Sequence, residues 1–169
     1  LTKETFRGYR SQGGWVIMHG RSEATNEWIV SQPDVITASD GIPFSEGRAH
    51  PRGAGTFARI LGRYVRERGA LSLMDALRKM TLLPARRLES VSPEMMAKGR
   101  IRVGADADLT LFDPNRVIDL ATYDEPDRFS EGIPHVLVAG TFVVRDGVIV
   151  DGVTPGQAIR GVSLDSSPD

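Results

Sequence analysis

The sequence predicts an α/β protein in two parts, a helix-rich piece over residues 1–95 and a small antiparallel β piece over residues 96–169. A strand–helix–strand pattern spans residues 15–39, which is the size of a parallel βαβ unit. Beyond residue 96, short β-like runs are separated by Ala139-Gly140 and Asp146-Gly147, dipeptides that favour hairpin turns. The first pattern predicts a parallel sheet and the second predicts an antiparallel one.

The first elements follow from apolar runs and capping residues. Residues 2–12 contain few apolar positions and predict a short helix or a partly ordered arm. The apolar run of residues 15–18 lies between glycines and predicts a buried strand. Residues 22–30 predict a helix with Ser22 as its N-cap. Residues 35–39 predict the next strand.

Three further helices are expected after a loop rich in glycine, proline and arginine over residues 41–55. Apolar residues recur at helical spacing over residues 57–65, with Thr56 as the expected cap and Gly69 as the stop. A second helix begins behind Ser72, and a third begins at Pro84.

The β piece is expected to contain five strands. They are residues 98–103, 107–112, 136–138, 141–145 and 148–150. A segment rich in proline and aspartate, residues 114–134, interrupts them and predicts an irregular excursion.

The composition excludes several classes of function. The net charge of -1 gives no electrostatic reason to expect nucleic acid, and the longest apolar runs are too short to span a bilayer. The chain has no cysteine, which excludes disulfides and fits a reducing compartment, so we expect a cytoplasmic location.

Asp40 is the first candidate for chemistry. It directly follows the expected strand of residues 35–39, and α/β barrels present catalytic groups at the carboxyl ends of their strands. The alternative is that Ser39-Asp40-Gly41 is only a turn, because Asp and Gly both favour turns that end strands. Spacing alone favours the turn.

His50 and Arg52 lie in the next loop. An arginine on a rigid loop suits bidentate binding of a substrate carboxylate, although an exposed arginine paired with a surface acid is the commoner case. A single histidine is likewise more often structural than catalytic. His19, at the end of the first strand, could face a barrel mouth, but we expect it to be buried and hydrogen-bonded, and we assign no chemistry to His135.

These residues, with their neighbours, resemble the C-terminal part of the N-acyl-D-amino-acid deacylases (D-aminoacylases) of the metal-dependent amidohydrolase superfamily. The similar motifs are Ala38-Ser39-Asp40-Gly41, His50-Pro51-Arg52-Gly53-Ala54-Gly55-Thr56-Phe57, Lys98-Gly99-Arg100-Ile101, Gly104-Ala105-Asp106-Ala107-Asp108-Leu109, Glu131-Gly132-Ile133-Pro134-His135 and Pro155-Gly156-Gln157-Ala158. The Gly-x-x-Ala-Asp-Leu pattern indicates only the superfamily. The combination Ser-Asp-Gly, His-Pro-Arg and Gly-Thr-Phe indicates the deacylase branch.

The resemblance implies a C-terminal fragment of a (β/α)8 TIM barrel, with its seventh and eighth strands in residues 1–95, plus part of a composite β-sandwich in residues 96–169. It implies zinc-assisted hydrolysis of an N-acyl-D-amino acid to a D-amino acid and a carboxylic acid. Asp40 matches the family's general base, which also donates the proton to the leaving amine and contacts the metal. Arg52 matches the residue that binds the substrate carboxylate, and His50 lines the same pocket.

The resemblance also implies that most zinc ligands lie upstream of this chain, because Asp40 alone cannot hold the ion. We therefore expect an incomplete piece that is inactive alone, with the upstream half of the barrel as its partner. Open strand edges would make the piece homo-oligomerise, aggregate, or persist only beside that half. A hydantoinase-like or dihydroorotase-like cyclic-amide hydrolase, and a non-catalytic binding or dimerisation module, are the alternatives.

Overall fold

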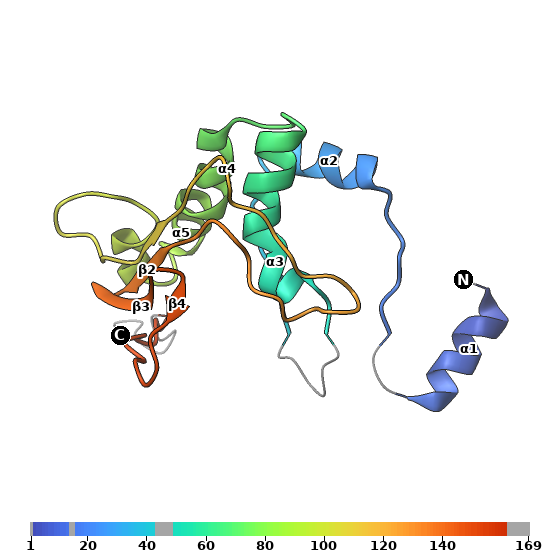
Figure 1. Cartoon of the computed structure of the whole chain (residues 1–169). Coiled ribbons are helices and arrows are strands. Elements are labelled where there is room, and N and C mark those ends of the chain that lie inside the picture. Colours follow the sequence, from blue (N-terminus) through green and yellow to red (C-terminus); the bar gives the residue numbers. More distant parts are fainter. Residues whose placement is uncertain (1, 14–15, 43–48, 162–169) are drawn as a thin grey trace, which may run out of the picture.

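The computed structural model describes residues 2–13, 16–42 and 49–161 of the chain (Figure 1). The helices are α1 (Lys3–Gln12), α2 (Glu23–Ser31), α3 (Arg52–Arg59) with its π-helical continuation η1 (Ile60–Glu67), α4 (Leu73–Met80), α5 (Leu82–Leu88) and the 3-10 turn η2 (Pro93–Ala97). The strands are β1 (Leu109–Leu111), β2 (His135–Val138), β3 (Thr141–Arg145) and β4 (Val148–Ile149). None of the helices in these described ranges is both long and apolar enough to cross a membrane.

Local capping sets where three helices begin. Thr2 and Thr5 form a reciprocal capping box at the start of α1, and Ser22 and Ser72 each accept a backbone N–H in the first turn of α2 and α4. These starts confirm the helices expected from the sequence. Helix α1 buries no residue, and it lies apart from the other helices in Figure 1.

The central helix begins earlier than Thr56, so the expected cap is wrong. The His50 Nδ1 accepts the N–H of Arg52 at 3.1 Å and the helix starts there. The hydroxyl of Thr56, already inside the helix, donates to the carbonyl of Arg52 at 2.9 Å. Gly69 follows the end of η1, as expected, and α5 begins at Leu82 rather than at Pro84.

The core is small and forms where the central helix meets α4 and the excursion between β1 and β2. Its buried members are Ala58, Ile60, Leu61, Tyr64, Ala76 and Val117. Gly62 allows the closest approach, because a Cβ added there would lie 2.4 Å from the carbonyl oxygen of Val117. The excursion is therefore packed against the helix that carries Arg52 at its start.

The two expected barrel strands are not strands in this chain, and those predictions are wrong as secondary structure. Residues 16–20 and 35–42 have no strand partner among the described residues, and Trp15 of the first strand lies outside them. Pairing requires a neighbouring strand, and the backbone of Thr37 instead donates to the carbonyl of Lys79 at 3.2 Å. Both segments expose apolar side chains, including Met18 and Ile36.

The β piece forms one antiparallel sheet in the order β1-β2-β3-β4. Four of the five expected strands are confirmed, and both expected turns are present. Ala139-Gly140 and Asp146-Gly147 have positive φ at both positions, as the right-handed twist of a two-residue hairpin requires.

The fifth expected strand, residues 98–103, is wrong. The side chain of Lys98 contacts Asp106 at 2.9 Å and Asp108 at 2.6 Å, and the N–H of Ala105 donates to the carbonyl of Arg102. These contacts close the segment into a loop. Ile101 and Val103, the apolar residues of this segment, are almost fully exposed.

Candidate functional site

Asp40 and Arg52 contact each other directly. The Arg52 Nη2 lies 2.7 Å from the Asp40 Oδ2, and its Nε donates to the Asp40 carbonyl at 2.8 Å. Asp40 has a φ of 49°, in the left-handed region that aspartate tolerates better than most residues. This conformation brings the end of the extended segment back toward the first residue of α3.

The pair lies at a pocket of about 930 Å³ that several elements line. The segment before α2 contributes His19 and Arg21, and α3 contributes Arg52 and Arg59. The excursion between β1 and β2 contributes Tyr123. Segments far apart in the sequence thus surround one cavity of the size that small-molecule ligands occupy.

His50 also lines this pocket, and its ring has a defined hydrogen bond. Because the Nδ1 accepts the N–H of Arg52, the proton of the neutral ring is on Nε2. Burial lowers the pKa of His50 from its ordinary value of 6.5, and the nearby Arg52 and His19 lower this pKa further, while Asp40 opposes them. The neutral form of His50 is therefore favoured.

Tyr123 stands between the two histidines of the pocket. Its ring centroid lies 4.5 Å from that of His19 and 5.3 Å from that of His50, both in edge-to-face geometry. His19 is exposed at the pocket rather than buried, which corrects the expectation for it. No periodic pattern in the sequence indicates Tyr123 as a pocket residue, since its position depends on how the irregular excursion packs against α3.

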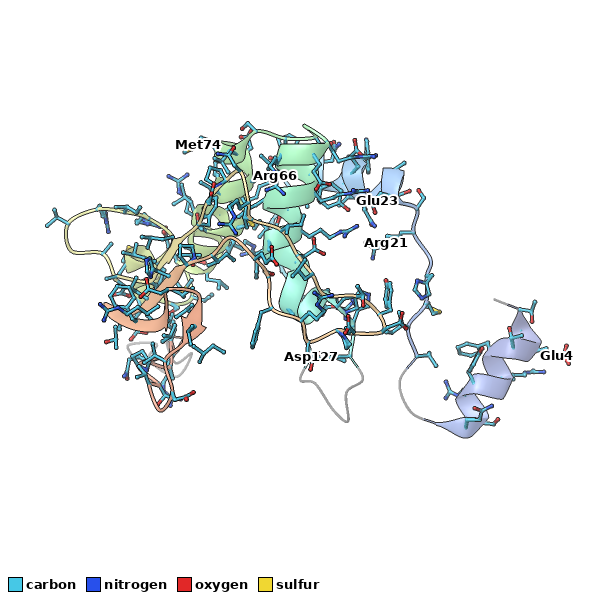
Figure 2. The ribbon with its side chains drawn as sticks, in the orientation of Figure 1. Glu4, Arg21, Glu23, Arg66, Met74 and Asp127 are labelled. Atoms are coloured by element: carbon cyan, nitrogen blue, oxygen red, sulfur yellow. The ribbon has the colours of Figure 1, made fainter. Side chains whose placement is uncertain are left out.

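Arg59 connects three elements along the same wall. Its guanidinium lies 3.3 Å from Glu23 of α2 and 3.4 Å from Asp119 of the excursion. In Figure 2, Arg21 and Glu23 project from the start of α2 toward α3. The charges of Arg59 are thus largely engaged within the chain, where Arg59 joins α2, α3 and the excursion.

The amidohydrolase family matches residues 9–144, which is most of the chain and includes every residue of this pocket. The chain belongs to the amidohydrolase family. The N-acyl-D-glutamate deacylase of Alcaligenes xylosoxydans xylosoxydans is 47% identical over 135 residues, 79% of this chain and 26% of that protein. This amidohydrolase chain therefore spans about a quarter of the length of that relative.

Two solved structures have the same fold over most of the chain. The N-acyl-D-glutamate deacylase of Bordetella bronchiseptica, solved with zinc and a phosphonate mimic of the tetrahedral intermediate, is 40% identical with a TM-score of 0.70. A D-aminoacylase, studied for its binuclear metal centre, is 35% identical with a TM-score of 0.75. Each alignment covers 82% of this chain and 28% of the solved chain.

The described residues of this amidohydrolase chain do not form a metal site by themselves. In residues 2–13, 16–42 and 49–161, no cluster of three or more His, Asp or Glu side chains is arranged to hold an ion. Asp40 is engaged by Arg52 instead. A complete zinc site needs three or four ligands, so Asp40 could supply only one of them.

The structure thus brings all three expected site residues, Asp40, His50 and Arg52, to one pocket. Their catalytic and binding roles stay predictions. His135 lies away from this group, in β2, where its Nδ1 accepts the N–H of Asp146 at 3.2 Å.

Proposed function

We propose that this chain supplies the C-terminal part of the active site of a metal-dependent N-acyl-D-amino-acid deacylase. The reaction is hydrolysis of the amide, which gives a D-amino acid and a carboxylic acid. The observation that carries the proposal is the contact of Asp40 with Arg52 at the pocket, in a chain whose relatives are named as deacylases of this class. Those names favour a deacylase over a cyclic-amide hydrolase.

Asp40 is the proton carrier in this proposal. Its side chain is 81% exposed, so water and substrate can reach the carboxylate. The carboxylate accepts a proton from the attacking water and then donates it to the nitrogen of the leaving amine. One residue thereby serves both proton transfers of the hydrolysis.

Arg52 binds the α-carboxylate of the substrate. Its guanidinium already contacts a carboxylate, that of Asp40, and the fork geometry suits a second one equally well. An exposed ion pair contributes only about 0–1 kcal/mol to stability, so exchanging Asp40 for a substrate carboxylate costs little. This exchange would free Asp40 when the substrate arrives.

The remaining parts of the proposal concern the complete enzyme. In the complete enzyme, residues 16–18 and 35–39 are proposed to be the seventh and eighth strands of a (β/α)8 barrel, and the sheet β1–β4 part of a β-sandwich. Zinc, when bound, would polarise the acyl carbonyl, and ligands other than Asp40 would come from outside this chain. We expect the chain alone to be inactive.

A chimera tests the proposal. The 135 matched residues of this chain would replace the corresponding quarter of the Alcaligenes N-acyl-D-glutamate deacylase. We expect the chimera to hydrolyse N-acetyl-D-glutamate. Asp40→Asn should lower kcat at least ~100-fold, whereas Arg52→Lys should mainly raise KM.

The matched control is Arg63→Lys, which changes an arginine of the same helix that pairs with Glu67 rather than with Asp40. It should leave both kinetic constants within about twofold of the chimera. Small and equal effects of Asp40→Asn and Arg52→Lys in a folded, active chimera would refute the assigned roles.

A further inference from the structure

We propose that His50 is a neutral hydrogen-bond donor that binds a carboxylate or carbonyl oxygen of the ligand through its Nε2–H. The inference rests on the proposed function for the identity of the ligand. It assigns to His50 a protonation state, a donor atom and a positioning mechanism. Three structural observations support it. They concern the Nδ1 atom, the packing of the ring and the Nε2 atom.

The first observation is the hydrogen bond at Nδ1. The backbone N–H of Arg52 is a donor that cannot become an acceptor, so the Nδ1 must be unprotonated to receive it at 3.1 Å. This contact ties the His50 ring to Arg52, the first residue of α3. The single ring proton of neutral His50 is consequently on Nε2.

The second observation is the position of the ring. Tyr123 packs edge-to-face against His50, and His19 packs against the other side of Tyr123. The excursion that carries Tyr123 is attached to α3, because Asp119 contacts Arg59 and the hydroxyl of Ser130 donates to the carbonyl of Ala54 at 3.4 Å. The His50 ring is thus held from the backbone side and from the aromatic side.

The third observation is what remains available to a ligand. Before a substrate carboxylate replaces Asp40, the Arg52 Nε and Nη2 are engaged by Asp40, and His50 lines the same pocket. In the described part of the chain, no group accepts a hydrogen bond from the Nε2–H of His50. The charged and titratable groups around His50 are His19, Asp40, Arg52 and Tyr123, and burial together with the Arg52 guanidinium favours a neutral ring with a low pKa.

The protonation state can be measured without any ligand. Two-bond ¹H–¹⁵N correlation spectra distinguish the two neutral forms of histidine, and the chain has only three histidines. A spectrum of His50→Asn assigns His50 by the signals that disappear. We expect the Nε2–H form to predominate near neutral pH, and a predominant Nδ1–H form would overturn the proposal.

Two substitutions separate binding from helix capping. His50→Asn keeps an oxygen acceptor at the position of Nδ1 but removes the donor at Nε2. His50→Gln places an amide N–H near the position of Nε2 but loses the acceptor that caps α3. If His50 is a donor, His50→Asn should weaken ligand binding about tenfold with little change in Tm. His50→Gln should lower Tm but preserve ligand binding within about threefold.

Binding is measured on the full chain by NMR titration with acetate and with N-acetyl-D-glutamate. Binding of both, weakened in His50→Asn, is the expected result. Binding of acetate alone, with the same loss in His50→Asn, supports the donor and contradicts the proposed substrate class. If His50→Asn binds acetate as tightly as the unsubstituted chain, or if the unsubstituted chain binds neither probe, the donor role is overturned.

Discussion

Arg52 holds together the start of α3 and the end of the extended segment before it. Its backbone N–H donates to His50, and its guanidinium contacts both the carbonyl and the carboxylate of Asp40. The sequence could place these three residues near one another, because two of them lie in one loop and the third ends the preceding segment. It could not predict that Arg52 engages Asp40, since that contact depends on the left-handed backbone of Asp40.

Gly62 supports a prediction at the scale of one residue. A Cβ at this position would lie 2.4 Å from the Val117 carbonyl and 2.6 Å from the Ile118 Cδ1. Gly62→Ala must therefore push the excursion away from the helix, and we expect a loss of about 2–3 kcal/mol in the free energy of unfolding. Urea-induced unfolding, followed by circular dichroism, measures it.

The control is Gly8→Ala in α1, where an added Cβ meets no atom within 4 Å. Alanine has the higher helix propensity, so this change should be neutral or slightly stabilising, by up to ~1 kcal/mol. Equal effects of the two substitutions would show that the excursion does not pack on Gly62 as described.

Among the secondary-structure elements, the sequence predicts the helices correctly. It also predicts two barrel strands that this chain does not form by itself. A helix closes its hydrogen bonds locally, and the caps Thr2, Ser22 and Ser72 can be identified from sequence. A strand needs a partner that lies elsewhere. The hairpins β2–β3 and β3–β4 carry their partners and turn residues in adjacent sequence, whereas residues 16–20 and 35–42 do not.

Asp108 supports a prediction about how the sheet is connected. Its carboxylate accepts the N–H of Ala139 at 2.8 Å and contacts Lys98, and these two interactions lower the pKa of Asp108 from its ordinary value of 3.8. A lowered pKa stabilises the folded state above the ordinary value, and this stabilisation is lost as the pH falls through the folded pKa. The relevant window therefore lies below about pH 4.

Asp108→Asn should reduce the free energy of unfolding at pH 7 by about 0.5–1 kcal/mol, a small value because the side chain is partly exposed. The difference between variant and unsubstituted chain should shrink as the pH is lowered from 5 to 3 in urea-unfolding experiments. The matched variant is Asp106→Asn. It loses a contact to the same lysine, Lys98, but no hydrogen bond from a backbone N–H, so it should show a smaller effect at pH 7. A difference for Asp108→Asn that stays constant with pH would contradict the assignment.

At the scale of the whole molecule, the chain exposes apolar side chains where the family resemblance expects barrel strands. Val16, Met18 and Ile36 are 58%, 69% and 38% exposed, and their segments lack strand partners in the described structure. Contiguous exposed apolar surface is typical of a face that another part covers. The barrel, the β-sandwich, the boundary near residue 95 and the cytoplasmic location stay predictions.

Hydrogen exchange followed by mass spectrometry tests whether these segments become strands. In the chain alone, the amides of residues 16–18, 36, 38 and 39 should exchange rapidly, because no group accepts a hydrogen bond from them in the described structure. In the chimera with the Alcaligenes deacylase, the same amides should be protected at least ~100-fold more. The amides of β2 and β3, paired in the chain already, serve as the control, and unchanged exchange of residues 16–18, 36, 38 and 39 would refute the barrel proposal.

We expect this chain to complete the active site of a stereospecific deacylase. The decisive measurement is the kcat/KM of the chimera for N-acetyl-D-glutamate and for its L enantiomer, compared with the chain alone. The chimera should hydrolyse the D enantiomer and discriminate strongly against the L enantiomer, and the chain alone should hydrolyse neither. A chimera that folds and binds zinc but hydrolyses neither enantiomer would contradict it.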